Sequence, residues 1–266
     1  MAVEKALSIP FKPRWAHSGL NQFRKFTKKL KIKLQSLRSS MISMIGTAIN
    51  ALSIIAAGLV GAILGARIGE ERKDEILRVL ALAVLLIGIK MSLSTKNPVL
   101  VTGSIVLGTL AGEAMGIEGK LNSFALNMQK RFSSSNFAEG FVTSTLLFCV
   151  GSMAIIGPIQ EGLTGDISIL LAKSMLDGVA AFFLASVLGL GVVFSSISVV
   201  AYQGFFTLLA SYISPYLSDA AITELTATGG LLIIAISMNL MGAVKFRVGN
   251  MLPSLLIAPV ASALIM

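Results

Sequence analysis

The sequence predicts an all-α polytopic membrane protein with about eight transmembrane helices, a class indicated by its composition and by its long apolar runs. Of its 266 residues, 55% are hydrophobic and 13% are charged, against about 25% charged residues in an ordinary soluble domain. The mean hydropathy is +0.84. Several uncharged runs approach the roughly 18–20 residues that cross a bilayer as a helix. A soluble protein with so little charge could not cover its surface with polar groups.

The net charge of +9 is confined to the first 43 residues, so it does not indicate a nucleic-acid partner. This segment holds ten Lys or Arg and one acid, whereas residues 44–266 hold twelve charges of each sign. Over 23–41, apolar residues at helical spacing alternate with lysines, which is typical of a basic amphipathic helix on an anionic membrane surface. A targeting segment and a misplaced start remain open as alternatives. We therefore separate 1–43 from a transmembrane domain over 44–266.

Eight apolar runs in the transmembrane domain give the expected spans. They cover residues 45–66, 77–94, 98–116, 139–157, 167–189, 191–213, 225–244 and 250–266. Glycines at helical spacing in the first span predict close packing on another helix. Gly157-Pro158 is expected to stop or kink the fourth span, and Pro253 and Pro259 to break the last.

The polar stretch 118–138 is expected to be a loop that joins the halves 44–117 and 139–266. A weak internal repeat crosses this division, because "LLIGIKMSL" (85–93) and "LIIAISMNL" (232–240) match at five positions. These segments would place spans 1–3 and 6–8 in an inverted repeat, an arrangement common in secondary transporters. Chance similarity between apolar segments is the alternative.

Lys and Arg indicate how the chain crosses the membrane. The odd-numbered loops carry nine of them, while the other side has only Lys90, Lys96 and Lys173 in or near its loops. The positive-inside rule then places the first loop in the cytoplasm and both ends of the domain outside, in the inner (plasma) membrane. The ten bases of 1–43 conflict with this orientation, so we expect the native protein to begin, or to be cut, near Met44.

The stretch "EGLTGDISILLAKSMLDG" (161–178) carries four ionisable residues between apolar spans. They are Glu161, Asp166, Lys173 and Asp177. If the fifth span begins at 167 with Asp166 as N-cap, the last three lie within about 40° of one helix face. Asp177 would then lie about 16 Å along the axis, near the bilayer midplane.

Charges at that depth are rare and usually face a cavity or pathway. Lys173 and Asp177 are an i,i+4 pair, so three interpretations stay open. The pair could be an ion or substrate site, a structural staple between helices, or a boundary error in which Lys173 reaches the interface.

Other polar residues complete the candidate set for substrate or ion binding. Glu161 follows a proline break, where a solvated loop acid is the usual explanation. Asn50, Asn239 and Asn250 lie within or at the ends of spans, where an amide can bind a ligand or a neighbouring backbone group. A single cysteine and a single histidine outside the spans predict no metal, no cofactor and no disulfide. We also expect no catalytic residues and no enzyme activity.

Three segments resemble one family of bacterial membrane proteins. They are "AINALSIIAAGLVGAILG", "LLFCVGSMAIIGPIQEGLTGDISILLAKSMLDG" and "RVGNMLPSLLIAPV". In these segments the chain resembles the YqgA/YdfK family, a domain of unknown function whose members are sometimes labelled transporters. The likeness covers about 44–266 and implies a start at a sequence like "MIGTAIN", which here begins at Met44. It implies no established activity, substrate or catalytic residue.

Two functions are compatible with these observations. The first is a secondary transporter or ion-coupled carrier of a small solute, in which Asp177 and Asp166 handle a proton or cation and Lys173 tunes them. The second is a membrane scaffold or regulatory partner that transports nothing. The partners expected in either case are the lipid bilayer and, for a carrier, an unknown small solute or ion. A homo-oligomer remains open.

Overall fold

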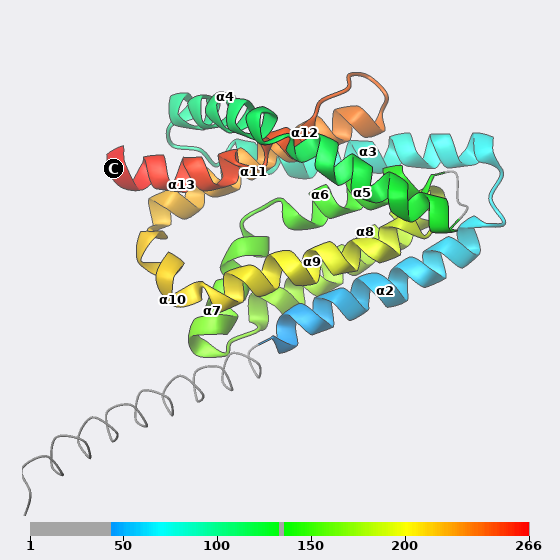
Figure 1. Ribbon diagram of the computed structural model, residues 1–266, viewed down its shortest axis with the longest axis horizontal. Helices are drawn as coiled ribbons and strands as arrows, with labels where there is room; N and C mark the ends of the chain where they lie inside the picture. The colour runs from blue at the N-terminus through cyan, green and yellow to red at the C-terminus, as the bar shows by residue number, and fades with distance from the viewer. Residues whose placement is uncertain (1–43, 133–135, 266) are drawn as a thin grey trace, which may run out of the picture. The chain divides into compact units, whose positions relative to one another are not determined.

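The computed structural model describes residues 44–132 and 136–265, and within these ranges the chain is helical with no strand (Figure 1). The all-α class is therefore confirmed. The segment 1–43, with the amphipathic helix expected over 23–41, lies outside the described residues. The helices are α2 (Ile45–Gly65), α3 (Glu70–Ser92), α4 (Pro98–Met115), α5 (Ile117–Phe132), α6 (Phe137–Cys149), α7 (Met153–Thr164), α8 (Ser168–Leu188), α9 (Gly191–Leu208), α10 (Ala210–Ile213), the 3₁₀ turn η1 (Ser214–Tyr216), α11 (Asp219–Leu240), α12 (Val248–Met251) and α13 (Ser254–Ile265).

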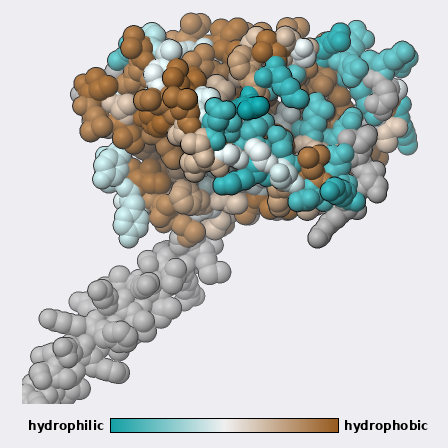
Figure 2. Space-filling model, turned by 45° about the horizontal axis from the view of Figure 1, so that its top comes forward, coloured by the Kyte–Doolittle hydropathy of each residue, from teal (hydrophilic) through white to brown (hydrophobic). Residues whose placement is uncertain are grey.

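Large apolar side chains cover much of the outer surface of the transmembrane domain. Val99, Met175 and Leu264 are 82%, 76% and 82% exposed, and Figure 2 shows apolar residues over a broad part of one face. In water, an apolar area of this extent would be an aggregation or interaction surface. On a protein whose helices are long enough to cross a bilayer, it is the surface that faces lipid.

Length and composition identify six described helices that could cross a membrane. These are α2, α4, α8, α9, α11 and the Val248–Ile265 segment, and the bent pair α6 and α7 makes a seventh if it counts as one span. The one expected span outside this set is the second, 77–94, which corresponds to α3. Charged residues occupy both ends of α3, so its uncharged run, Val79–Ile89, is shorter than a bilayer requires. The count of eight therefore stays a prediction.

The helices form two groups that pack side by side. Figure 1 shows α2, α8 and α9 running next to one another, with α6 and α7 against α9. In the other group α11 packs against α3 and α13, and α13 packs against α4. The paired segments proposed as a repeat lie together in this group, where Ser237 Oγ donates to the Ala81 carbonyl oxygen at 2.6 Å. The inverted repeat itself stays a prediction.

The close contact between α2 and α8 depends on glycine, as the glycine spacing predicts. A Cβ atom at Gly61 would meet the carbonyl oxygen of Phe182, and one at Gly65 would meet that of Ser186. The two backbones are therefore as close as small residues allow, which is how membrane helices gain packing energy without a hydrophobic driving force. This approach brings the polar residues of both helices within hydrogen-bonding distance.

The break in the fourth span does not fall at Gly157-Pro158, so that prediction is wrong. Pro158 lies inside α7. The chain bends by 59° between α6 and α7, at Gly151, whose φ of +114° is outside the helical region. Glycine reaches that conformation without a steric cost. The last span was expected to break at Pro253 and Pro259. The break at Pro253 is observed, because α12 ends at Met251 and α13 begins at Ser254, whereas Pro259 lies inside α13, so that part of the prediction is wrong.

The stretch 118–138, expected to be a loop, contains most of α5. Leu121, Phe124, Ala125 and Met128 recur at the helical i, i+3, i+4, i+7 spacing. Ala125 is fully buried, and the Phe124 ring lies 5.5 Å from that of Phe141. The helix is therefore amphipathic and packs on α6, a pattern that its charged, Asn and Gln residues conceal.

Candidate functional site

Lys173 and Asp177 form an ion pair on the buried face of α8. The Lys173 Nζ atom donates to both carboxylate oxygens of Asp177, at 2.9 Å and 2.7 Å. Only 5% of Lys173 and 7% of Asp177 is exposed. The i,i+4 pairing expected from the sequence is therefore present, and Lys173 does not reach solvent.

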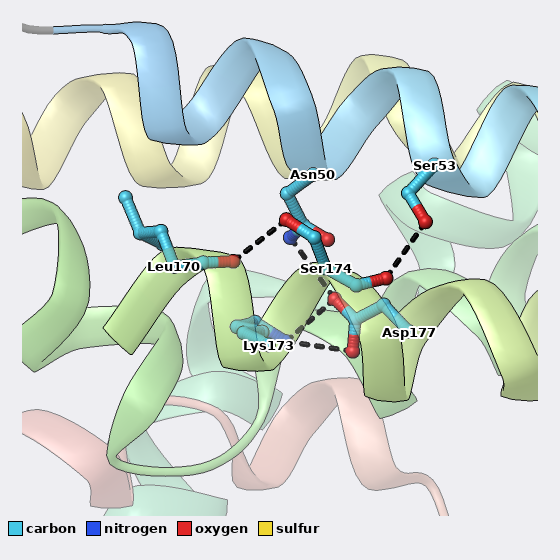
Figure 3. Close-up of polar contacts among 6 residues, drawn as sticks. All are labelled: Asn50, Ser53, Leu170, Lys173, Ser174 and Asp177. Carbon is cyan, nitrogen blue, oxygen red and sulfur yellow. Dashed lines mark hydrogen bonds and ion pairs between the residues drawn. The ribbon is translucent and has the colours of Figure 1, made fainter. Parts of the chain in front are cut away.

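Helix α2 supplies the third member of the cluster. The Asn50 Nδ2 atom donates to Asp177 Oδ2 at 3.0 Å, and one turn further the Ser53 hydroxyl donates to the Ser174 carbonyl oxygen at 2.7 Å (Figure 3). Asn50 is fully buried, and its Oδ1 atom has no hydrogen-bond partner. We call Asn50, Lys173 and Asp177 the polar triad.

The ion pair of the polar triad lies near the middle of α8, a helix long and apolar enough to cross a membrane. Asp177 is the tenth of the 21 residues of α8, or about 14 Å along the axis. Placing charges at that depth costs at least about 2.5–3.5 kcal/mol each on insertion scales. Lys173 and Asp177 offset this cost by neutralising each other, so removal of either would leave the other uncompensated.

The break between α6 and α7 lies beside the polar triad. Cys149 ends α6 and packs in one apolar cluster with Ile54 and Ala181, which are each one turn beyond Asn50 and Asp177. A break inside a span leaves the last carbonyls of one half-helix and the first N–H groups of the next without helical partners, and transporters use such ends to bind substrates and ions.

Glu161 is a buried residue that caps another helix, rather than a solvated loop acid. It is fully buried in α7, and its carboxylate accepts from the backbone N–H of Gly46 at 2.6 Å and from the Thr47 hydroxyl at 3.3 Å. These donors belong to the first turn of α2, where the helix dipole favours a negative charge. The usual interpretation fails because the partner lies 115 residues away in sequence.

Asp166 does not join the polar triad. It is exposed and accepts from the backbone N–H of Ser168, the first residue of α8, at 2.9 Å. This hydrogen bond lowers the pKa of the Asp166 carboxyl below its ordinary value. Asp166 therefore serves the start of the helix, which begins one residue later than expected.

The two remaining asparagines also lie away from the polar triad. Asn239 exchanges two hydrogen bonds with the backbone of Phe246, at 2.9 Å and 2.7 Å, and so closes the turn after α11. Asn250 Oδ1 accepts from the Glu118 N–H at 2.9 Å, where α12 meets α5. Both bind backbone groups, the second of the two roles considered for them.

Thr47, Gln203 and Glu224 are among the fully buried polar residues that sequence reasoning did not single out. Thr47 lies one turn before Asn50, and its i,i+3 spacing is the only signal that could have identified it. Gln203 in α9 is 0% exposed, and neither atom of its side-chain amide has a hydrogen-bond partner. Glu224 accepts from the N–H groups of Lys96 and Asn97, at 2.9 Å and 3.2 Å, at the start of α4. Across the described residues, no three His, Cys, Asp or Glu side chains are placed to hold a metal ion.

The comparisons with known proteins cover the whole transmembrane domain. Residues 45–263 match a family described as "Protein of unknown function (DUF554)". The chain is 35% identical over 221 residues to the uncharacterized membrane protein YdfK of Bacillus subtilis (strain 168), which covers 82% of this chain and 95% of that protein. It is 34% identical over 227 residues to the uncharacterized protein YqgA of Escherichia coli (strain K12), covering 83% and 97%. No solved structure matches.

Proposed function

Since the chain belongs to the DUF554 family and has the helices of a membrane protein, we propose that it is a secondary transporter, an ion-coupled carrier of a small solute. The polar triad is its coupling site. Asp177 binds the coupled proton or cation, Lys173 competes for the same carboxylate, and Asn50 holds it in place. The carrier works in the inner (plasma) membrane as a multi-pass protein and converts no substrate chemically.

The observation that carries this proposal is the position of the polar triad beside the broken span. A buried ion pair alone is poor evidence of function, because a well-packed apolar pair is often equally stable. Here the pair sits at mid-span, and the buried Asn50 Oδ1 atom beside it has no partner. Cys149, the last residue of α6, packs with Ile54 and Ala181, one turn beyond Asn50 and Asp177. Unpaired polar groups at that depth are costly unless a ligand or water satisfies them.

Asp166 has no place in the proposed coupling site, because it is exposed and already holds the start of α8. Asn239 and Asn250 have none either, since each binds the backbone of a distant turn. The solute is expected to bind beside the polar triad, between α2 and α8.

A solute screen followed by a flux assay tests the proposal. Purified protein is melted in the presence of a panel of ions and small solutes, and those that raise the melting temperature are tested for flux in proteoliposomes. Wild-type protein should transport at least one of them, and Asp177→Asn should not. Asp166→Asn provides the matched control and should transport normally.

A scaffold or regulatory partner is the second candidate function. The observation that favours it is the complete mutual pairing of Lys173 and Asp177, which with the glycine contacts of α2 and α8 would make the polar triad a structural staple. A protein that co-purifies in fixed proportion, together with no flux for any solute of the panel, would support this second function.

A further inference from the structure

Glu161 and the polar triad lie on one polar face of α2. Glu161 accepts from Thr47, and Asn50, one turn further, donates to Asp177. Thr47 and Asn50 are i,i+3 neighbours, so they share a helix face and are about 4.5 Å apart along the axis. Two buried carboxylates from different helices are therefore connected through successive turns of α2.

Gln203 lies in the same part of the core. Helix α9 runs along α2 in the opposite direction, because Val193 contacts Gly58 while Gly204 contacts Met44. Gln203 is therefore near the level at which Glu161 binds α2. Four residues further along α9, Thr207 contacts Gly162, the neighbour of Glu161.

The opposite neighbour of Gln203 on that face connects it to the polar triad. Val199, four residues earlier, packs in the cluster that contains Ile54 and Cys149. Residues four apart share a helix face, so the Gln203 side chain lies on the face of α9 between Val199, which packs with Ile54 one turn beyond Asn50, and Thr207, which packs on the neighbour of Glu161. The two unpaired amide atoms of Gln203 and the unpaired Asn50 Oδ1 supply two acceptors and one donor, the groups that hold buried water.

We propose that Glu161 and Asp177 are two stations of one proton path along α2, joined by water molecules held at the unpaired amide atoms of Asn50 and Gln203. A proton that binds the Glu161 carboxylate passes through these waters and protonates Asp177, which removes the counter-charge of Lys173. No other reactant is needed. The inference rests on the proposed carrier function only in making the proton its coupled ion.

The two carboxylates differ in the charged groups around them, and this difference is consistent with Glu161 taking up the proton first and Asp177 second. The groups bound to Glu161 are the neutral donors Gly46 and Thr47 of α2, and its neighbour Gly162 lies against the Thr207 carbonyl oxygen and Ala210. The one charged group of the adjoining loop, Asp166, is exposed and bound to Ser168. The groups around Asp177 are Lys173, Asn50 and Ser53, with Cys149 of α6 nearby. Only the second carboxylate has a cation that its protonation releases.

Glu224 shows what a merely structural carboxylate looks like in this fold. It is equally buried and also caps a helix, α4. The buried residues in the next turn of α4 are Leu100 and Val101, which are apolar, so no polar face leads from it to a second acid. Glu224→Gln is therefore the matched control for Glu161→Gln.

The test follows protonation of Asp177 after a sudden drop in pH. The full chain is placed in lipid nanodiscs, and time-resolved infrared spectroscopy records the protonated-carboxyl band that Asp177→Asn removes. We expect Glu161→Gln and Gln203→Met each to slow the appearance of this band about tenfold or more, equivalent to about 1.4 kcal/mol in the transfer barrier. Glu224→Gln and Gln160→Met, a neighbouring glutamine that bonds Asp166 instead, should leave the rate unchanged.

Three results would overturn the path. They are an unchanged rate in Glu161→Gln and Gln203→Met, an equal slowing in the two controls, and an Asp177 band that never appears at any pH at which the fold survives. The solute flux assay separates this inference from the proposed function. If Gln203→Met transports normally and its Asp177 is protonated at the wild-type rate, the proton path is wrong and the carrier function stands. If Gln203→Met slows the protonation of Asp177 but wild type transports no solute, the carrier function is wrong and the proton path stands.

Discussion

Asp177 and Lys173 neutralise each other in the core, so removal of one charge strands the other. Asp177→Asn should lower the free energy of unfolding by about 3–5 kcal/mol if Lys173 stays charged, because the Lys173 ammonium is 5% exposed and keeps no carboxylate partner. Thermal or denaturant unfolding in detergent measures this loss. A loss below about 1 kcal/mol is what a substitution at an exposed site causes. Such a result would show that Lys173 is not left as an unpaired buried charge, because it loses its proton or binds another partner.

Asp166 provides the control at the residue scale. Asp166→Asn should leave the melting temperature at neutral pH close to that of wild type, because the side chain is exposed. The Ser168 N–H lowers the pKa of the Asp166 carboxyl. The stability that this hydrogen bond adds is therefore fully present above the ordinary aspartate pKa, and it is lost as the pH falls through the lowered pKa. Over this acid range the melting temperature should therefore fall less steeply with decreasing pH for Asp166→Asn than for wild type. An identical pH dependence in the two proteins would contradict the role assigned to Asp166.

Sequence reasoning anticipates residues whose partners are close in the chain and misses those whose partners are far away. The pairing of Lys173 with Asp177 follows from the four-residue helical spacing. The capping of α2 by Glu161, by contrast, joins residues 115 apart, and nothing local to Glu161 indicates that it is buried. The role of Gln203 depends on the packing of α9 against two other helices, which no sequence period encodes.

Elements meet through glycine where two helices approach most closely. Gly61→Ala should destabilise the protein by about 1–3 kcal/mol, because its Cβ would meet the carbonyl oxygen of Phe182, and backbone cannot rotate away. Gly103→Ala is the matched control, since nothing lies within 4 Å of its Cβ position, and alanine in a helix interior is favoured by about 0.5–1 kcal/mol. Equal effects of the two changes on the melting temperature would refute the close contact of α2 and α8.

A buried carboxylate from α11 satisfies the start of α4. Glu224→Ala should cost about 1–3 kcal/mol, because the N–H groups of Lys96 and Asn97 lose their acceptor in a buried site. Glu113→Ala removes only an exposed ion pair with Arg247 and should cost less than about 1 kcal/mol. Unfolding experiments on both variants decide, and a Glu224→Ala protein as stable as Glu113→Ala would contradict the capping role.

At the element scale, apolar length and glycine spacing predict most of the helices, and conformation at single residues explains the misses. The fourth span was expected to break at Pro158, but α7 accommodates the proline and the backbone turns at Gly151 instead. Helix α5 was not predicted because its apolar positions are interspersed with charged, Asn and Gln residues. Both errors arise because packing against neighbouring helices, and not local hydrophobicity alone, determines the conformation of these segments.

For the whole molecule, the orientation and the role of α3 can be tested together. The described part of the chain has one cysteine, Cys149, and it is buried, so a Cys149→Ser background allows single exposed cysteines to be labelled. A membrane-impermeant maleimide should label Ser94→Cys and Tyr216→Cys in intact cells. It should label Arg67→Cys and Lys245→Cys only after lysis, as the positive-inside rule requires. The reverse pattern would overturn the orientation, and labelling of positions 67 and 94 from the same side would show that α3 does not cross.

The central claim is that the polar triad works as a coupling site and does not merely join two helices. The most direct measurement compares wild type with the double variant Lys173→Met, Asp177→Leu for melting temperature and for flux of the solute that stabilises wild type. Replacing a buried ion pair with apolar residues of similar volume is often neutral or stabilising, so we expect the double variant to melt at or above the wild-type temperature and to transport nothing. A double variant that is well folded and transports as wild type does would contradict the account and leave the polar triad as a structural contact.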